Sequence, residues 1–151
     1  MATVRHATLD DLEAIMALAR EFIMFAPHAS VADVSSEELE QQARTCIEHA
    51  LVLVAEDESK VVGMLVGVLT GLWFSPSTLM AAELAWWVTP SARNGSAGIR
   101  LVTAFQDWAR EQGAKVVTMS SLDLDFDTRV SSVLERMGFK ASEHTHMKRL
   151  N

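Results

Sequence analysis

The segment from Arg93 to Gly98 contains small and polar residues in an arrangement that could bind a phosphate or pyrophosphate group. It follows a short apolar run, Glu83–Thr89, which ends at Pro90 and therefore predicts a strand. The residues after Gly98 predict a helix, because apolar side chains recur on one face, at Leu101, Val102, Phe105, Trp108 and Ala109. The N–H groups at a helix start lack partners and, with the helix dipole, attract anions. A simple tight turn could use the same loop, so the prediction depends on the surrounding elements.

The predicted elements follow the order strand, two helices, three strands, helix, strand, helix and strand. Helical spacing of apolar residues predicts helices over residues 12–23, 36–50 and 128–137. Apolar runs predict strands over residues 4–8, 51–56, 60–74 and 115–122, and residues 139–150 are expected to form a final strand or strand pair. The polar turn Asp57-Glu58-Ser59 can join two of these strands into a hairpin. We expect Gly63, Gly67 and Gly71 to mark places where a helix or ligand approaches a strand closely.

Composition excludes several classes of protein. The chain has 151 residues, which predicts one domain with a sizeable core. A net charge of −7 argues against non-specific nucleic-acid binding, which requires a basic surface. The single cysteine, Cys46, allows no internal disulfide and indicates a reducing compartment. The N-terminus has no apolar signal core, and the longest apolar run, residues 61–74, is too short for a typical membrane span. We therefore expect a cytoplasmic protein with no membrane segment.

The loop resembles the acyl-CoA-binding loop of the GNAT N-acyltransferase superfamily, whose pattern is R/Q-x-x-G-x-G/A between a strand and a helix. The matching residues here are Arg93, Asn94, Gly95, Ser96, Ala97 and Gly98. Ser96 stands where the pattern prefers glycine. Near the other end of the chain, the sequence LERMGF is similar to the L-Y-x-x-x-G-F segment of that family. The order of predicted elements also matches the family over nearly the whole chain.

The resemblance implies a single GNAT-like domain over residues 1–151. Its fold class is α+β, in three layers, with a central, mixed and mostly antiparallel sheet flanked by helices. The implied cosubstrate is acetyl-CoA. The strand Glu83–Val88 is expected to separate from its neighbour and to leave backbone donors at Trp86, Trp87 and Val88 for the pantetheine arm and the thioester oxygen. A well-placed donor of this kind contributes about 3 kcal/mol to catalysis. The N–H groups of Arg93 to Gly98 are expected to hold the pyrophosphate, with the Arg93 side chain as a possible further positive charge.

Glu83 is the candidate general base, because it is the only carboxylate in its strand and the resemblance places an acidic residue near this point. An amine is protonated at neutral pH and must lose a proton before it can attack. The alternatives are a solvated carboxylate without a role and proton removal through ordered water. The usual acid is absent, because Leu134 stands where the family often has tyrosine and the chain contains no tyrosine at all. Ser131 or Ser132 is a weaker candidate for that role.

Several other polar residues have a simpler interpretation than chemistry. Asp123, Asp125 and Asp127 have the spacing that begins a calcium loop, but the glycine and final carboxylate of such a loop are missing. His144 and His146 are two possible ligands and make no specific site, so no metal is expected. Cys46 lies on the apolar face of a predicted helix and is expected to pack rather than to react. His28 is expected to be a plain surface residue, with contact to the acceptor as the alternative. Of the two adjacent tryptophans, one is expected to pack in the core and the other could line the acceptor cleft.

The main hypothesis is an acetyl-CoA-dependent N-acetyltransferase that acts on a primary amine by direct attack on the thioester. The alternative is a non-catalytic acyl-CoA-binding or regulatory protein, which the missing tyrosine and Ser96 motivate. A third possibility is an interaction protein without a cofactor. The apolar surplus between Leu69 and Leu84 further predicts a homodimer. The sequence does not identify the acceptor.

Overall fold

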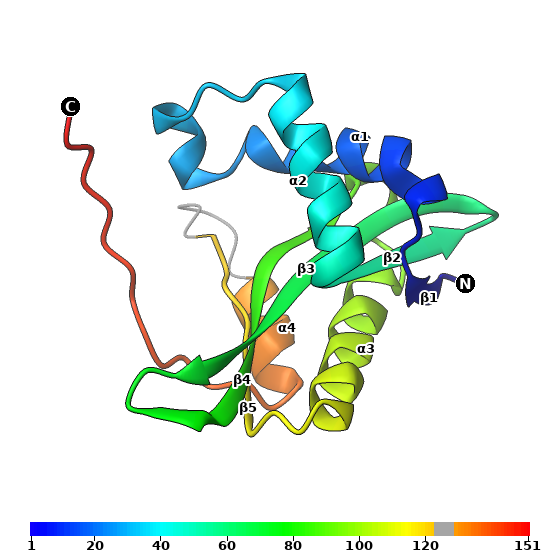
Figure 1. Ribbon diagram of the computed structural model, residues 1–151. Coiled ribbons are helices and arrows are strands. Elements are labelled where there is room, and N and C mark those ends of the chain that lie inside the picture. The colour runs from blue at the N-terminus through cyan, green and yellow to red at the C-terminus, as the bar shows by residue number, and fades with distance from the viewer. Residues whose placement is uncertain (123–128) are drawn as a thin grey trace.

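The computed structural model of the chain describes residues 1–122 and 129–151 (Figure 1). The described elements, in chain order, are β1 (Thr3–His6), α1 (Leu12–Ile23), α2 (Ser36–His49), β2 (Leu51–Asp57), β3 (Lys60–Leu72), β4 (Ser75–Val88), α3 (Ala97–Glu111), β5 (Val116–Thr118) and α4 (Arg129–Arg136). Short 3-10 helices lie at Leu9–Asp11, Pro27–Val31 and Pro90–Ala92. The predicted helices are all confirmed.

The five strands form one sheet in the order β1-β2-β3-β4-β5. The first three pairings are antiparallel, and β4 pairs with β5 in parallel. The predicted hairpin of β2 and β3 is confirmed. Its turn places Glu58 and Ser59 at φ angles of 49° and 65°, the left-handed region that a tight hairpin turn requires. The sheet is thus mixed and mostly antiparallel, as the sequence predicts.

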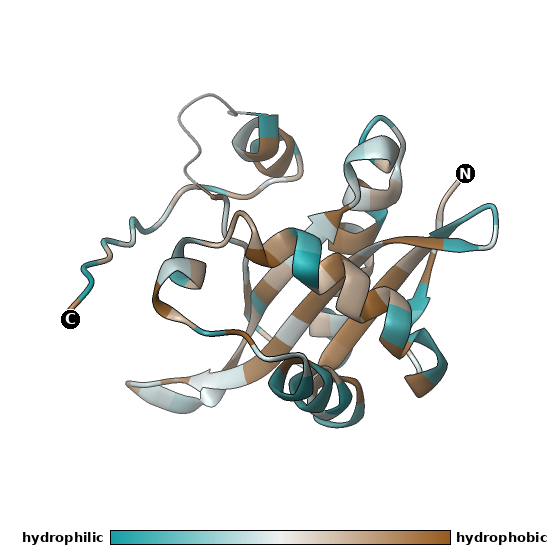
Figure 2. Ribbon diagram, turned by 90° about the horizontal axis from the view of Figure 1, so that it is seen from above, coloured by the Kyte–Doolittle hydropathy of each residue, from teal (hydrophilic) through white to brown (hydrophobic). Residues whose placement is uncertain are grey.

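Helices cover both faces of the sheet, which makes three layers (Figure 1). Helices α1 and α2 pack on one face through a buried cluster that includes Ile15, Leu18 and Trp87. Helices α3 and α4 pack on the other face through a cluster centred on Leu101, Phe105 and Leu134. Figure 2 shows the strands between these layers coloured largely as hydrophobic. This arrangement confirms the predicted α+β fold class, and it explains why β2 and β3 are nearly continuous apolar runs.

The glycines of β3 allow α3 to approach the sheet closely. A Cβ atom on Gly67 would lie 2.7 Å from the Phe105 ring, which is fully buried in the core. A Cβ atom on Gly63 would lie 3.0 Å from the Trp87 carbonyl oxygen and 3.3 Å from the Leu101 side chain. Both positions therefore confirm the expected close contact of a helix with the strand. Gly71 instead faces the backbone of Pro76 in the β3–β4 hairpin.

The strand predicted at Glu83–Thr89 is longer than expected, because β4 begins at Ser75. Residues 75–82 pair with the outer half of β3 in one long hairpin. Its turn contains Trp73 and Phe74, which are 90% and 69% exposed. A pair of aromatic residues is an unusual turn, because Gly, Pro, Asn and Asp usually occupy such positions, and here Gly71 and Pro76 only flank it. The sequence therefore indicated one strand to Phe74 and no strand before Glu83.

The predicted final strand, Phe139–Leu150, is wrong in this structure. These residues form no helix or strand, nearly all are exposed, and the segment runs away from the body of the protein (Figure 1). The segment is rich in charged and polar residues, so it offers no continuous apolar face to bury against the sheet. The strand predicted at 115–122 is likewise shorter, at Val116–Thr118. Within residues 1–122 and 129–151, no helix has the length and apolar character needed to cross a membrane.

Candidate active site

Strands β4 and β5 separate next to Glu83. Their parallel pairing joins Met80 to Val116 and Ala82 to Thr118, and it stops there. Beyond that point β4 continues to Val88 with β3 on one side and, within the described residues, no strand on the other. The backbone groups on the open edge of residues 83–88 therefore lack strand partners. An extended ligand arm could bind them in the gap between the two strands.

A β-bulge adjoins this point of separation. On β3, the consecutive residues Val66 and Gly67 face Ala85 and Glu83, so that Leu84 is the extra residue on β4. An extra residue reverses which side chains face each side of the sheet. Ala81 accordingly packs on the α3 face, whereas Ala85 and Trp87 pack on the α1 face. The bulge beside the candidate base thus determines which face of the sheet each following side chain of β4 points to.

The carboxylate of Glu83 lies at the opening between the two strands. The backbone N–H of Ser120, just after β5, donates a hydrogen bond of 2.9 Å to Glu83 Oε2. Burial raises the pKa of Glu83 to about 7, although the Ser120 hydrogen bond acts in the opposite direction. A carboxylate with such a pKa is partly ionised at neutral pH and holds an accepted proton well. These properties suit a general base.

The raised pKa of Glu83 should make the free energy of unfolding depend on pH. Between its ordinary pKa of 4.5 and about 7, the folded protein binds this proton more tightly than the unfolded chain does. The contribution of Glu83 to stability therefore falls as the pH rises through that window. Glu83→Gln removes the titration, so the variant should gain stability relative to the wild type as the pH rises. Urea unfolding of both proteins across this range measures the difference, and a difference that does not change with pH would contradict the assignment.

The loop before α3 presents several free backbone donors. Within residues 93–98, the N–H groups of Arg93 and Gly95 donate to Pro90 and Ala92 in consecutive turns. The first helical hydrogen bond runs from the Arg100 N–H to the Ser96 oxygen. Four other N–H groups of the loop have no backbone acceptor within the described residues. They belong to Asn94, Ser96, Ala97 and Gly98. Of the predicted anion-binding donors, these four are therefore the ones available to a ligand, and they lie at the positive end of the α3 dipole.

Ser96 fits this loop without strain, although the family pattern prefers glycine there. Its φ and ψ angles are −93° and −3°, which any residue can adopt. Gly98 lies where α3 meets the sheet. A Cβ atom there would lie at ordinary contact distances, 3.4 Å from the Trp86 ring and 3.7 Å from Val88 Cγ2, so α3 begins directly against β4. The departure at Ser96 therefore does not weaken the loop.

The two adjacent tryptophans point to opposite faces of the sheet, as the sequence predicts. Trp86 packs on the α3 face, and Trp87 packs on the α1 face with an exposure of 9%. The indole nitrogen of Trp86 is buried and has no hydrogen-bond partner in the described part of the chain. An unpaired buried donor beside Gly98 is costly unless a ligand accepts from it. Together with the open β4 edge and the free loop donors, it fits a ligand with both phosphate and amide groups, such as acyl-CoA.

Family comparison agrees with this geometry. The profile of the acetyltransferase (GNAT) family matches residues 13–139. The chain belongs to the GNAT family of acetyltransferases. It is accordingly an acetyl-CoA-dependent N-acetyltransferase, which confirms the expected fold, activity and cosubstrate. The matched range includes β4, the loop, α3 and α4, so it contains every candidate site residue.

Individual relatives agree with the family assignment. An uncharacterized N-acetyltransferase, YhfO, of Bacillus subtilis (strain 168) is 27% identical over 141 residues, which cover 91% of this chain and 89% of that protein. Among solved structures, AAC(6')-Iy in complex with the bisubstrate analog CoA-S-monomethyl-acetylneamine has a TM-score of 0.78, with 15% identity over 100% of this chain and 99% of that one. A transcriptional regulator from Bacillus halodurans C-125 also has a TM-score of 0.78, with 19% identity over 99% and 100% of the two chains. These structures share the fold.

The position where GNAT enzymes often carry a tyrosine is part of the core here. Leu134 is 7% exposed and packs in the cluster beneath α3. Ser131 lies one turn earlier on α4, and its hydroxyl is 3.4 Å from that of Ser121, the residue after the Ser120 that bonds to Glu83. A thiol has an ordinary pKa of about 8.5, so a thiolate can leave without a strong acid. The structure therefore pairs Ser131 with Ser121 and places Leu134 among apolar neighbours.

The other polar candidates do not join this site. Asp123, Asp125 and Asp127 lie outside the described residues. Over the described chain, no group of three or more His, Cys, Asp or Glu side chains is placed to hold a metal ion. Burial raises the pKa of the Cys46 thiol, which disfavours the reactive thiolate. The packing interpretation of Cys46 is therefore the better one.

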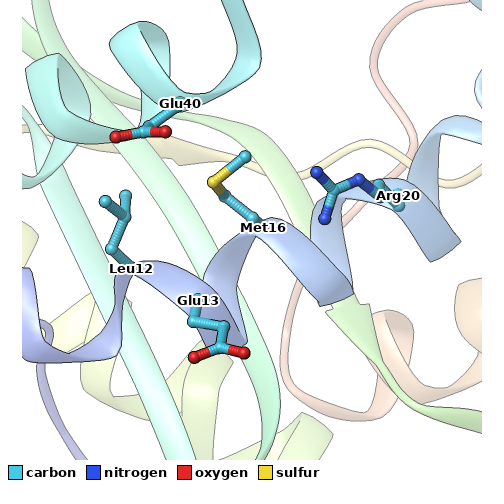
Figure 3. Close-up of a pocket in the computed structure, with 5 residues that line it drawn as sticks. All are labelled: Leu12, Glu13, Met16, Arg20 and Glu40. Carbon is cyan, nitrogen blue, oxygen red and sulfur yellow. The ribbon is translucent and has the colours of Figure 1, made fainter. Parts of the chain in front are cut away.

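A surface depression between α1 and α2 is separate from the site (Figure 3). Its lining consists of Leu12, Glu13, Met16, Arg20 and Glu40. Glu40 already accepts a hydrogen bond of 2.9 Å from Arg44 of the same helix. None of the residues predicted for catalysis or cofactor binding lines this depression. It adds no group to the GNAT site.

Sequence analysis missed two residues that bond to the candidate site, Ser120 and Glu21. The Ser120 N–H, which bonds to Glu83, belongs to a residue 37 positions away, and only the pairing of β4 with β5 brings them together. Glu21, near the end of α1, accepts hydrogen bonds from Trp87 and Thr89. A single charged residue on a largely apolar helix face could have indicated Glu21, but nothing in the spacing identifies its partner.

Proposed function

We propose that this GNAT enzyme acetylates a primary amine by direct attack on the thioester, with Glu83 as the general base. The observation that supports this role is the position of the Glu83 carboxylate where β4 and β5 separate, with a pKa raised to about 7 by burial. In the proposed reaction Glu83 takes a proton from the ammonium group of the acceptor. The free amine then forms an N–C bond with the thioester carbonyl carbon. As the C–S bond breaks, the nitrogen loses its second proton, the CoA thiolate takes up one proton to leave as the thiol, and Glu83 returns its own proton to solvent.

The cosubstrate would lie along the open edge of β4. Acetyl-CoA supplies an activated acyl group, and the chain supplies the donors that hold it. We assign the pantetheine arm to the backbone of Trp86, Trp87 and Val88, and the pyrophosphate to the loop residues Arg93, Asn94, Gly95, Ser96, Ala97 and Gly98. The free N–H groups in that loop and the unpaired Trp86 indole support this placement. We further propose that residues 1–151 act as one domain in the cytoplasm.

An acceptor screen tests the function. The purified protein is incubated with acetyl-CoA and a panel of small amines, aminoglycosides, peptides and lysine-containing proteins, and released CoA is detected as free thiol. A no-acceptor sample corrects for the Cys46 thiol and for hydrolysis. Thiol release that depends on one class of amine would support the proposal and identify the acceptor class. A protein that binds acetyl-CoA and acetylates no amine would instead be a non-catalytic acyl-CoA-binding protein.

We also propose a homodimer. The tip of the β3–β4 hairpin exposes Trp73 and Phe74, whose rings meet edge to face with centroids 5.7 Å apart. Val116, on the edge strand β5, is exposed as well, at 42%. Such apolar groups favour contact with a second copy.

Light scattering should therefore report twice the 16.6 kDa mass of one chain at micromolar concentrations. Trp73→Arg should shift the mass toward the monomer, because a charge would have to be desolvated at the interface. Lys140→Arg, on the exposed C-terminal segment, serves as the control and should leave the mass unchanged. A monomer mass for the wild type across the concentration range would contradict the dimer.

A further inference from the structure

Trp87 lies at the centre of a group of side chains that no catalytic role explains. We define the Trp87 cluster as Glu21, Phe25, Trp87, Thr89 and Arg93. It connects the end of α1, the end of β4 and the first residue of the acyl-CoA loop. The end of α1 is remote in sequence from the other two parts, so the cluster ties α1 to the junction between β4 and the loop.

Glu21 holds the indole of Trp87 in place. Its Oε2 accepts a hydrogen bond of 2.8 Å from Trp87 Nε1, and its Oε1 accepts one of 3.2 Å from the Thr89 hydroxyl. Phe25 stacks on the indole, with ring centroids 5.3 Å apart and an interplanar angle of 25°. Because Trp87 is 9% exposed, water cannot easily replace Glu21 as the acceptor. Both oxygens of a single carboxylate thus set the orientation of the last residues of β4.

Arg93 rests on the same indole. Its guanidinium carbon lies 4.3 Å from the centroid of the Trp87 ring, and its Nε donates a hydrogen bond of 2.9 Å to the Val88 oxygen. In the described part of the chain, no carboxylate lies within ion-pair distance of Arg93. A cation over an aromatic ring is stabilised by about 0.5–2 kcal/mol, depending on its exposure. The first residue of the loop is therefore anchored on a ring that Glu21 orients.

We propose that Glu21 is a positioning residue for acyl-CoA, which acts through Trp87 and Arg93 on the loop that holds the pyrophosphate. The inference rests on the proposed assignment of the loop as the cofactor site. When Glu21 is replaced by a residue without side-chain oxygens, the buried Trp87 N–H and the Thr89 hydroxyl lose their acceptor. The indole then reorients, and Arg93 loses the surface on which it is stacked. The four free donors after Arg93 no longer converge on one anion.

The first test is acetyl-CoA binding by calorimetry. Glu21→Ala should raise the Kd for acetyl-CoA about tenfold. This is the change expected when the loss of one buried hydrogen bond weakens binding at the loop. Glu21→Gln keeps one acceptor oxygen for Trp87 and should stay within about threefold of the wild type. Glu13→Ala, an exposed acid on the same helix, is the matched control and should bind as the wild type does. Should the alanine variant fail to fold, Glu21→Met retains the length of the side chain without an acceptor and takes its place.

The second test separates positioning from general damage. A positioning role raises the KM for acetyl-CoA and leaves kcat at saturating acetyl-CoA unchanged, whereas partial unfolding lowers the apparent kcat. If Glu21 acts through Arg93, the variant with both Glu21→Ala and Arg93→Ala should bind no more weakly than Arg93→Ala alone. A folded Glu21→Ala protein with wild-type Kd and KM would overturn the inference, as would fully additive effects. Absence of acetyl-CoA binding by the wild type would overturn the cofactor site itself.

Discussion

Glu83→Gln lowers turnover by roughly 10²–10⁴-fold and leaves the affinity for acetyl-CoA unchanged, if Glu83 is the base. Glutamine has the same shape and keeps an oxygen that can accept the Ser120 N–H, so the geometry at the strand opening is retained. It cannot accept the proton of the ammonium group. The change therefore removes one chemical step and preserves the site around it.

The pH dependence of turnover provides the decisive measurement. Since burial raises the pKa of Glu83 to about 7, wild-type turnover should rise as the pH passes through that value and Glu83 ionises. The Gln variant should lack this step. Its deficit should shrink as the pH approaches the pKa of the acceptor amine, because free amine then exists without a base. Glu111→Gln, at the exposed end of α3, serves as the surface control and should behave as the wild type. Equal turnover and equal pH profiles in Glu83→Gln and wild type would eliminate Glu83 as the base.

Gly98→Val should reduce acetyl-CoA affinity by roughly a hundredfold, the loss expected when two hydrogen bonds to a charged phosphate are blocked. The glycine is the second residue of α3 and packs against β4. The two added methyl groups of valine must either press on the Trp86 ring or cover the free N–H groups of the loop. Either outcome prevents a phosphate from approaching those donors.

Gly98→Ala is the matched control for this prediction. Its Cβ would lie 3.4 Å from Trp86 and 3.7 Å from Val88, which are ordinary contacts, so the variant should fold and bind nearly as the wild type does. Calorimetry with acetyl-CoA, after circular dichroism has confirmed folding, compares the three proteins. A folded Gly98→Val protein with wild-type affinity would show that the pyrophosphate lies elsewhere.

Local patterns in the sequence were sufficient for much of the fold. The helical spacing of apolar residues identified α1, α2, α3 and α4, because a helix must turn one face toward the sheet. Ser35 precedes α2, and its hydroxyl accepts a hydrogen bond from the Glu38 N–H, a local contact that caps the helix start. The strand, loop and helix around Arg93–Gly98 were likewise predictable. Each of these features depends on residues within a few positions of one another.

The tertiary structure alone decided the features that depend on distant partners. The bulge at Leu84 follows from the pairing of β4 with β3, and it determines that Ala81 and Ala85 face opposite sides of the sheet. The early start of β4 and the absence of a strand after Phe139 also depend on which segments find a partner. Strand pairing is a long-range property, and a run of apolar residues does not encode its register.

In the candidate site too, some features follow from local sequence and others depend on distant residues. The sequence by itself determined that Glu83 is a carboxylate within an apolar strand, that a helix begins after Arg93–Gly98, and that no tyrosine is available as an acid. Only the tertiary structure placed the Ser120 N–H on Glu83 and stacked Arg93 on an indole held by Glu21. The physical reason is that burial and hydrogen bonding to remote residues set the pKa and orientation of a side chain, whereas its sequence neighbours set only its local conformation.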